Sequence, residues 1–414
     1  MIMDRIYGYG MTTTSGGNLS VKDQEGSIWI TPGGIDKGEL KPEQIVRVDR
    51  SGEWEGPLRP SLELPFHQAI YAARPDAGAV LHAHPPALVS FSITDQIPDT
   101  SILPNARNVC GEVGFAPYAL PGSAGLAKNV SEVFERGHDT VIMENHGIVT
   151  IGESVFQSFQ RFETLDFCAR LIINGKFLGK VHPLSPDKLN LSRRSIRPLP
   201  EAPPGVPSRQ EMELRKSMCT FIHRAYQQKL ITSTEGTFSA RMDEEHFVIT
   251  PFGMDRKLIE PEDLVLIKKG RREKGKTPSR SVGLHQEIYK KYRHSNAIII
   301  AHPPNTMAFG VSGTKIDTTA IPESYVFLRD IPLLPFGVQY EDDKTLAGVI
   351  SDQVPIAMIE NDCIIVSGKD LLNCFDRLEI TEFIAESIIS AKKLGTLHAM
   401  DHLRIQELKD AFLS

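Results

Sequence analysis

The chain has 414 residues, 41% of them hydrophobic and 24% charged, which is an ordinary globular composition in a length that exceeds one typical core. Its formal net charge of -6 provides no basic surface for nucleic acid, so we expect no nucleic-acid partner. No apolar run reaches the roughly 18 residues of a membrane helix, and the amino terminus lacks a secretory pattern, so we expect a cytoplasmic protein without membrane contact.

Predicted strands and helices alternate along the first half of the chain. Two short β-rich runs come first, at residues 27–31 and 45–48, and the first of them ends in a Pro/Gly turn. A helix over about 62–73 follows, and then an apolar strand at 79–82. Apolar residues spaced by three and four predict a long amphipathic helix over 153–173. This alternation indicates a mixed α/β domain.

A proline-rich segment separates the two halves of the chain. Proline lacks an amide hydrogen and fixes its own φ angle, which disfavours regular structure over most of residues 184–208. The prolines in and beside this segment are Pro183, Pro186, Pro198, Pro200, Pro203, Pro204 and Pro207. We therefore expect an exposed, semi-extended linker between a first domain of residues 1–183 and a second domain of residues 209–414.

The second half of the chain repeats the first. His67 and Tyr71 have counterparts in His285 and Tyr289, 218 residues later, within stretches of matching sequence. Similar matches continue on both sides at offsets between 216 and 219 residues, which indicates a tandem duplication. The elements predicted for the second copy are strands at 247–250, 264–267 and 297–301 and helices at about 209–228, 281–293 and 369–393.

Five cysteines are scattered along the chain without CxxC spacing: Cys110, Cys168, Cys219, Cys363 and Cys374. Such spacing does not indicate a metal or redox motif. We expect reduced thiols, mostly in apolar surroundings.

Three histidines of the first copy form a candidate metal site. His82 and His84 alternate along a predicted strand, so their side chains point to the same side. His146 lies in a distant Asn-His-Gly sequence. A lone histidine is usually structural, but three neutral imidazoles suit a divalent metal with one open coordination position. Zinc is the favoured ion, although other divalent first-row metals accept the same ligands.

Glu63 is the candidate acid/base beside this metal. It begins a predicted helix behind Pro60 and Ser61, where the helix dipole alone would favour a carboxylate. The sharper interpretation is that Glu63 moves a proton at a carbon next to a metal-polarised carbonyl. His67, one turn further on, either holds Glu63 or packs beneath it, and we favour the structural role.

The second copy lacks most of these groups. Its corresponding residues are Ser281, Ile300, His302 and Asp362. Isoleucine cannot ligate a metal and serine is a poor base, so we expect no zinc in the second copy. One copy is interpreted as catalytic and the other as structural.

Five stretches of the first copy together resemble the successive signatures of the class II aldolase/adducin family: Ser15-Gly16-Gly17-Asn18-Leu19-Ser20, Ile30-Thr31-Pro32, Pro60-Ser61-Leu62-Glu63, His82-Ala83-His84 and Asn145-His146-Gly147. The resemblance covers nearly the whole first domain, and in the second it extends to the framework only. It implies two tandem α/β/α domains, each with a central mixed, mainly antiparallel sheet flanked by helices. It also implies zinc on His82, His84 and His146, with Glu63 as the acid/base.

The family's substrate site falls on residues that partly depart from its pattern. The positions implied to bind substrate are Gly17, Asn18, Gly33, Gly34, Ser61 and Leu62. Gly33 and Leu62 replace hydroxyl residues that hold a phosphate in sugar-phosphate members, so the substrate need not carry one. The family's donor tyrosine is also absent from residues 102–105. Tyr118, or Tyr325 or Glu323 of the second copy, are alternatives that the sequence does not separate.

The resemblance favours a zinc-dependent lyase that cleaves a carbon–carbon bond of a sugar-derived or hydroxy-acid small molecule by retro-aldol chemistry. A decarboxylase or an epimerase on the same scaffold is the alternative enzyme. A non-enzymatic, adducin-like assembly module is the alternative of another class. Single-domain members form rings of four chains, so a homodimer with a pseudo-four-fold ring is the expected assembly.

Overall fold

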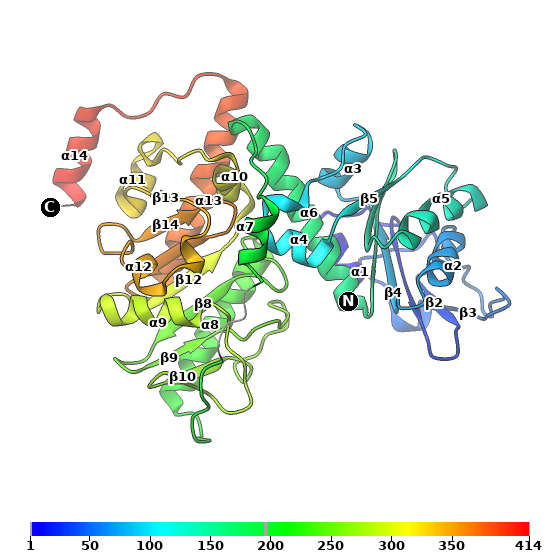
Figure 1. Ribbon diagram of the computed structural model, residues 1–414, viewed down its shortest axis with the longest axis horizontal. Helices are drawn as coiled ribbons and strands as arrows, with labels where there is room; N and C mark the ends of the chain where they lie inside the picture. Colours follow the sequence, from blue (N-terminus) through cyan, green and yellow to red (C-terminus); the bar gives the residue numbers. More distant parts are fainter. Residues whose placement is uncertain (1, 194–197, 414) are drawn as a thin grey trace. The chain divides into compact units, whose positions relative to one another are not determined.

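The computed structural model describes residues 2–193 and 198–413. They form two compact units, unit 1 (Met1–Arg170) and unit 2 (Leu171–Ser414), and each has its own sheet (Figure 1). The boundary falls inside the long helix α6, Val155–Leu178. In the part of the chain that the structure describes, no helix is both long and apolar enough to cross a membrane.

Unit 1 is built around a seven-stranded sheet of order β3-β2-β1-β4-β7-β6-β5. The strands are β1 (Asn18–Lys22), β2 (Ile28–Ile30), β3 (Val46–Val48), β4 (Ala79–Ala83), β5 (Val113–Ala116), β6 (Thr140–Met143) and β7 (Gly147–Gly152). The α-helices are α1 (Ile2–Gly8), α2 (Leu64–Ala73), α3 (Pro86–Ser92), α4 (Pro104–Cys110), α5 (Ala124–Glu135) and most of α6. Every neighbouring pair is antiparallel except β5 and β6, so the predicted mixed, mainly antiparallel sheet is confirmed.

One face of this sheet packs against α2 and α5, which lie side by side in Figure 1. Val80 of β4 and Phe66 of α2 belong to the shared core. Because side chains alternate along a strand, His82 faces the same side as Val80, and its ring meets Phe66 edge-on with centroids 5.6 Å apart. The sheet therefore directs His82 toward the amino-terminal part of α2.

Unit 2 repeats this plan with an eight-stranded sheet of order β11-β10-β9-β8-β12-β15-β14-β13. The strands are β8 (Thr237–Arg241), β9 (His246–Ile249), β10 (Val265–Lys268), β11 (Arg271–Arg272), β12 (Ala297–Ala301), β13 (Leu333–Leu334), β14 (Ile356–Ile359) and β15 (Ile364–Gly368). The α-helices after α6 are α7 (Pro186–Leu191), α8 (Arg209–Gln227), α9 (Val282–Lys291), α10 (Pro304–Ser312), α11 (Pro322–Leu328), α12 (Asp343–Ala347), α13 (Leu371–Leu394) and α14 (His402–Phe412). The duplication predicted from the sequence is confirmed in structure.

The two copies share their strand register. Asn18 of β1 pairs with His82 of β4 in unit 1, and Thr237 of β8 pairs with Ile300 of β12 in unit 2. Strand β1 was not predicted, and neither was β8, its counterpart in the second copy. The common register means that residues at matching positions can be compared directly between the copies.

The segment predicted as an irregular linker contains one helix, α7. Proline is compatible with the first turn of a helix because the amide there needs no intrahelical partner, and Pro186 occupies that turn. Ser185 caps the helix by accepting a hydrogen bond from the Lys188 amide at 3.4 Å. The prediction of no regular structure was therefore wrong for Pro186–Leu191. Residues 194–197 of the predicted linker lie outside the described residues.

The cysteine prediction is borne out: all five thiols are free and buried. Burial raises the pKa of Cys110 and of Cys168 above the ordinary thiol value, which keeps both protonated and unreactive.

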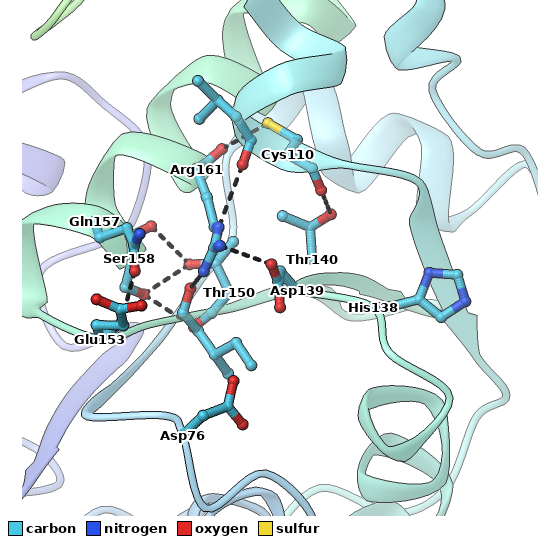
Figure 2. A network of polar contacts seen from close by, with 12 residues as sticks. Asp76, Cys110, His138, Asp139, Thr140, Thr150, Glu153, Gln157, Ser158 and Arg161 are labelled. Carbon is cyan, nitrogen blue, oxygen red and sulfur yellow. Dashed lines mark hydrogen bonds and ion pairs between the residues drawn. The ribbon is translucent and has the colours of Figure 1, made fainter.

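A polar network around Arg161 ties α6 to the sheet of unit 1 (Figure 2). The guanidinium donates to the Ile151 carbonyl at 2.6 Å and to the Val109 carbonyl at 3.3 Å. It also pairs with Asp139 at 2.6 Å, and Arg74 reaches the same carboxylate at 3.0 Å. One arginine thus satisfies groups from three separate segments.

We expect Arg161→Met to destabilise unit 1 by about 2–3 kcal/mol, because Asp139 and two carbonyls lose a charged donor. Hydrogen exchange of the β6 and β7 amides in the full chain measures this change for unit 1 alone. Arg136→Met, at an exposed position, is the matched control and should leave protection unchanged. Equal protection in the two variants would contradict a stabilising role for the network.

Candidate metal centre and active site

The structure brings the three predicted metal ligands together in unit 1. One ring nitrogen from each of His82, His84 and His146 lies within 4.8 Å of the other two. Strand β4 and the residue after it supply the first two, and the turn between β6 and β7 supplies the third. Among the residues described, this is the one group of its kind.

The turn that carries His146 is held by its neighbours. Asn145 adopts a left-handed conformation with φ of 52°, and its backbone N–H donates to the Ser92 carbonyl at 3.1 Å. A Cβ atom at Gly147 would lie 2.6 Å from the Ala83 carbonyl oxygen and 2.9 Å from His84 Cδ2. Glycine is therefore required for this turn to approach β4.

Hydrogen bonding prepares His82 as a ligand. Its Nδ1 lies 2.9 Å from the Ile148 carbonyl oxygen, which can only accept, so Nδ1 carries the proton. Nε2 then faces the site, 3.1 Å from Nε2 of His84. Burial, reinforced by the neighbouring imidazoles, lowers the pKa of His84 to about 3, so the His84 ring is neutral. This donor set fits a divalent metal.

Glu63 lies directly against these histidines. Its Oε1 is 3.0 Å from His146 Nε2, and its Oε2 is 3.1 Å from His82 Nε2. Burial by itself would raise the pKa of Glu63, but the two imidazoles hold that pKa well below its ordinary value. Glu63 is the residue preceding α2, yet its side chain makes no capping bond to the helix. The carboxylate is thus committed to the site and not to the helix terminus.

Asn18 supports Glu63 from β1. Its Nδ2 donates to Glu63 Oε2 at 2.7 Å and to Ser61 Oγ at 3.0 Å. Its Oδ1 lies 2.5 Å from His67 Nε2. His67 therefore reaches Glu63 through Asn18 and does not contact the carboxylate in a direct hydrogen bond.

The remaining predicted substrate residues lie around Asn18 and Glu63. Gly17 has φ of 70°, and a Cβ atom there would lie 2.8 Å from the His82 carbonyl oxygen, so only glycine fits beside β4. A Cβ atom at Gly33 would lie 3.6 Å from the Pro60 carbonyl oxygen, which places the Gly33-Gly34 turn beside Ser61. Leu62 is 72% exposed, so an apolar group is presented beside Ser61 at this position.

Sequence reasoning missed the buried partners of His67. Ser20 Oγ lies 2.7 Å from His67 Nδ1 and 2.9 Å from the Tyr71 hydroxyl. Unit 2 repeats this arrangement with Ser239 and Tyr289, so the internal repeat was the signal that could have identified these residues.

The candidate proton donors occupy different places. Tyr118 is 55% exposed. Its backbone amide donates at 2.7 Å to the carboxylate of Glu144, which is two residues before His146 in the sequence. Tyr325 and Glu323 belong to α11 of unit 2. No hydrogen bond of the Tyr118 hydroxyl to Glu63 or to the histidines is present in the part of the chain that the structure describes.

Unit 2 has a core where unit 1 has its site. Ile300 is buried in the hydrophobic cluster between the sheet and α9, at the register position of His82. Ser281 precedes α9 with φ and ψ of −80° and 7°, close to the −91° and 8° of Glu63 before α2. Unit 2 therefore keeps the backbone conformation of unit 1 at these positions but replaces the glutamate by serine and the histidine by isoleucine. The described residues of unit 2 contain no cluster of three metal-ligating side chains.

One protein family matches each half of the chain separately, and individual relatives match less than half of its length. A family model described as the Class II Aldolase and Adducin N-terminal domain matches residues 2–173 and again residues 216–389. L-fuculose phosphate aldolase from Methanococcus maripaludis is 36% identical over 172 residues, which cover 41% of this chain and 89% of that protein. 3-oxo-tetronate 4-phosphate decarboxylase from Pectobacterium atrosepticum is 34% identical over 168 residues, 39% of this chain and 76% of the relative. A solved structure of L-fuculose 1-phosphate aldolase matches with a TM-score of 0.42 at 30% identity, covering 46% of this chain and 89% of that one.

Proposed function

Because this chain belongs to the class II aldolase and adducin family, we propose that unit 1 is a zinc-dependent lyase that cleaves a carbon–carbon bond by retro-aldol chemistry. The proposed substrate is a sugar-derived or hydroxy-acid small molecule in which the broken bond joins the carbon beside a carbonyl group to the hydroxyl-bearing carbon that is released. One observation carries the proposal: the Glu63 carboxylate lies within 3.1 Å of two of three convergent histidines. A non-enzymatic scaffold has no physical need for such an arrangement.

The residues of unit 1 have distinct roles in this proposal. A metal ion held by His82, His84 and His146 would supply a Lewis acid that withdraws electrons from the substrate carbonyl. Glu63 exchanges a proton with the carbon beside that carbonyl. In the cleavage direction the hydroxyl of the departing fragment releases its proton to solvent, and the fragment leaves as an aldehyde. The electron pair of the broken bond stays on the carbon beside the carbonyl. Glu63, after taking up one proton from solvent, delivers that proton to this carbon in place of the lost fragment.

Decarboxylation is the second candidate. One relative is a 3-oxo-tetronate 4-phosphate decarboxylase, and loss of carbon dioxide from a 3-oxo acid also leaves an electron pair next to a carbonyl. The same proton transfer by Glu63 would complete that reaction. The two candidates differ in the fragment that leaves, so their products separate them.

A substrate panel tests the proposal. Zinc-loaded protein is incubated with L-fuculose 1-phosphate, a 3-oxo-tetronate 4-phosphate and the unphosphorylated form of each, and products are identified by NMR. We expect a ketone and an aldehyde from a sugar substrate, with about one zinc ion per chain. The unphosphorylated compounds are included because Gly33 and Leu62 offer no hydroxyl to a phosphate.

Three results would each contradict the proposed retro-aldol lyase. Release of carbon dioxide from the 3-oxo acid would support the decarboxylase. Interconversion of two stereoisomers would support an epimerase. Absence of bound zinc together with no turnover of any compound would overturn the enzyme and favour the assembly module.

A further inference from the structure

The amide of Asn18 has no donor left for a substrate. Both of its Nδ2 protons are used, one by Glu63 Oε2 at 2.7 Å and one by Ser61 Oγ at 3.0 Å. The side chain is 3% exposed. These two hydrogen bonds fix which end of the Asn18 amide is the nitrogen.

This orientation sets the direction of a buried chain of hydrogen bonds behind Glu63. With Nδ2 facing Glu63, the Oδ1 atom of Asn18 faces His67 Nε2 at 2.5 Å, so Nε2 must carry the ring proton. His67 Nδ1 then accepts from the Ser20 hydroxyl at 2.7 Å. Ser20 Oγ in turn accepts from the Tyr71 hydroxyl at 2.9 Å. Every group in the chain has a defined role as donor or acceptor.

Unit 2 shows which part of this chain belongs to the fold. Ser239 still bonds to His285 Nδ1 at 2.6 Å and to the Tyr289 hydroxyl at 2.7 Å. Thr237 replaces Asn18 and bonds instead to Ser279 at 2.7 Å. His285 Nε2 is left buried without a hydrogen-bond partner. The serine, histidine and tyrosine therefore persist without a catalytic carboxylate, whereas the asparagine link exists only in the copy that has Glu63.

We propose that Asn18 is a positioning residue that aims the carboxylate of Glu63, and that it does not donate to an anionic group of the substrate. The role of Glu63 rests on the proposed lyase function. The hydrogen-bond chain from Tyr71 through His67 holds the Asn18 amide in the orientation that Glu63 requires. Ser61 and the Gly33-Gly34 turn are left to contact the substrate's far end.

Kinetics separates positioning from substrate binding. With the substrate that the panel identifies, Asn18→Ala should lower kcat by about 10–100-fold through misplacement of Glu63, with KM unchanged within twofold and zinc still bound. Asn18→Asp should lower kcat further, because it sets a second carboxylate against the first. Thr237→Ala, at the matching position of unit 2, is the control and should leave both constants unchanged. A tenfold rise in KM with kcat preserved in Asn18→Ala would overturn the proposal.

A measurement without turnover keeps this proposal separate from the lyase function. NMR of zinc-loaded, nitrogen-labelled protein should show neutral His67 protonated on Nε2. The side-chain amide signal of Asn18 should shift in Glu63→Gln and not in Ser281→Ala, its unit 2 counterpart. If the Asn18 signal is the same in Glu63→Gln and the wild type, or if His67 is protonated on Nδ1, the positioning role is wrong whether or not the protein is a lyase.

Discussion

Glu63→Gln is expected to lower turnover by about 10²–10⁴-fold while zinc content stays at the wild-type level. Glutamine keeps the size of the side chain and can remain near His82 and His146, but it cannot accept and return a proton. The expected loss belongs to kcat, because the change removes a step of the reaction and leaves the three metal ligands in place.

The same variant series contains its own control. Ser281 precedes α9 as Glu63 precedes α2, so Ser281→Ala probes the matching position in unit 2. It should leave kcat, KM and zinc content unchanged. Steady-state kinetics and metal analysis of the purified proteins check both variants. Full activity in Glu63→Gln would eliminate Glu63 as the acid/base, whereas loss of zinc in that variant would assign the carboxylate to metal binding.

His84→Ala is expected to abolish stoichiometric zinc binding and, with it, turnover. Two imidazoles would remain, fewer than the three protein ligands of a catalytic zinc site. Zinc per chain, measured by mass spectrometry of dialysed protein, should fall from about one to near zero. His302→Ala, the matching residue of unit 2, should keep the full zinc content.

Thermal stability gives a second readout of the same site. A ligand that binds only the folded state stabilises it by about 2.7 kcal/mol at a concentration of 100 times its Kd. Chelation should therefore lower the Tm of the wild type and of His302→Ala but leave His84→Ala unchanged. Stoichiometric zinc in His84→Ala, or a chelator effect that persists in it, would mean that the metal lies elsewhere.

Local patterns were sufficient to predict the repeated framework. The helix predicted over about 62–73 is α2, which begins at Leu64, with Glu63 as the residue before its first turn. The strand predicted at 297–301 is β12. These elements were predictable because hydrophobic periodicity reports which face of a segment is buried. The HxH pair on β4 was predictable for the same reason, since side chains two residues apart on a strand share a side.

Contacts between distant segments could not be predicted in this way. Asn18 and Glu63 are 45 residues apart and meet only because β1 pairs with β4 beside the start of α2. A strand was not predicted at β1, although Leu19 and Val21 alternate with polar residues there, and Asn18 was expected to face the substrate. Whether its amide serves Glu63 or a ligand depends on strand register, which is decided by packing across the whole sheet.

The sequence by itself determined that the protein is a duplicated α/β chain of the class II aldolase and adducin family, and that one copy carries three histidines and a glutamate. These properties follow from the identities of the residues and their spacing along the chain. Only the tertiary structure decided that the three imidazoles converge, that Glu63 lies against them, and that Asn18 stands between Glu63 and His67. The physical reason is that hydrogen-bond geometry depends on ångström-scale distances between strands and helices, which exist only after the sheet has formed.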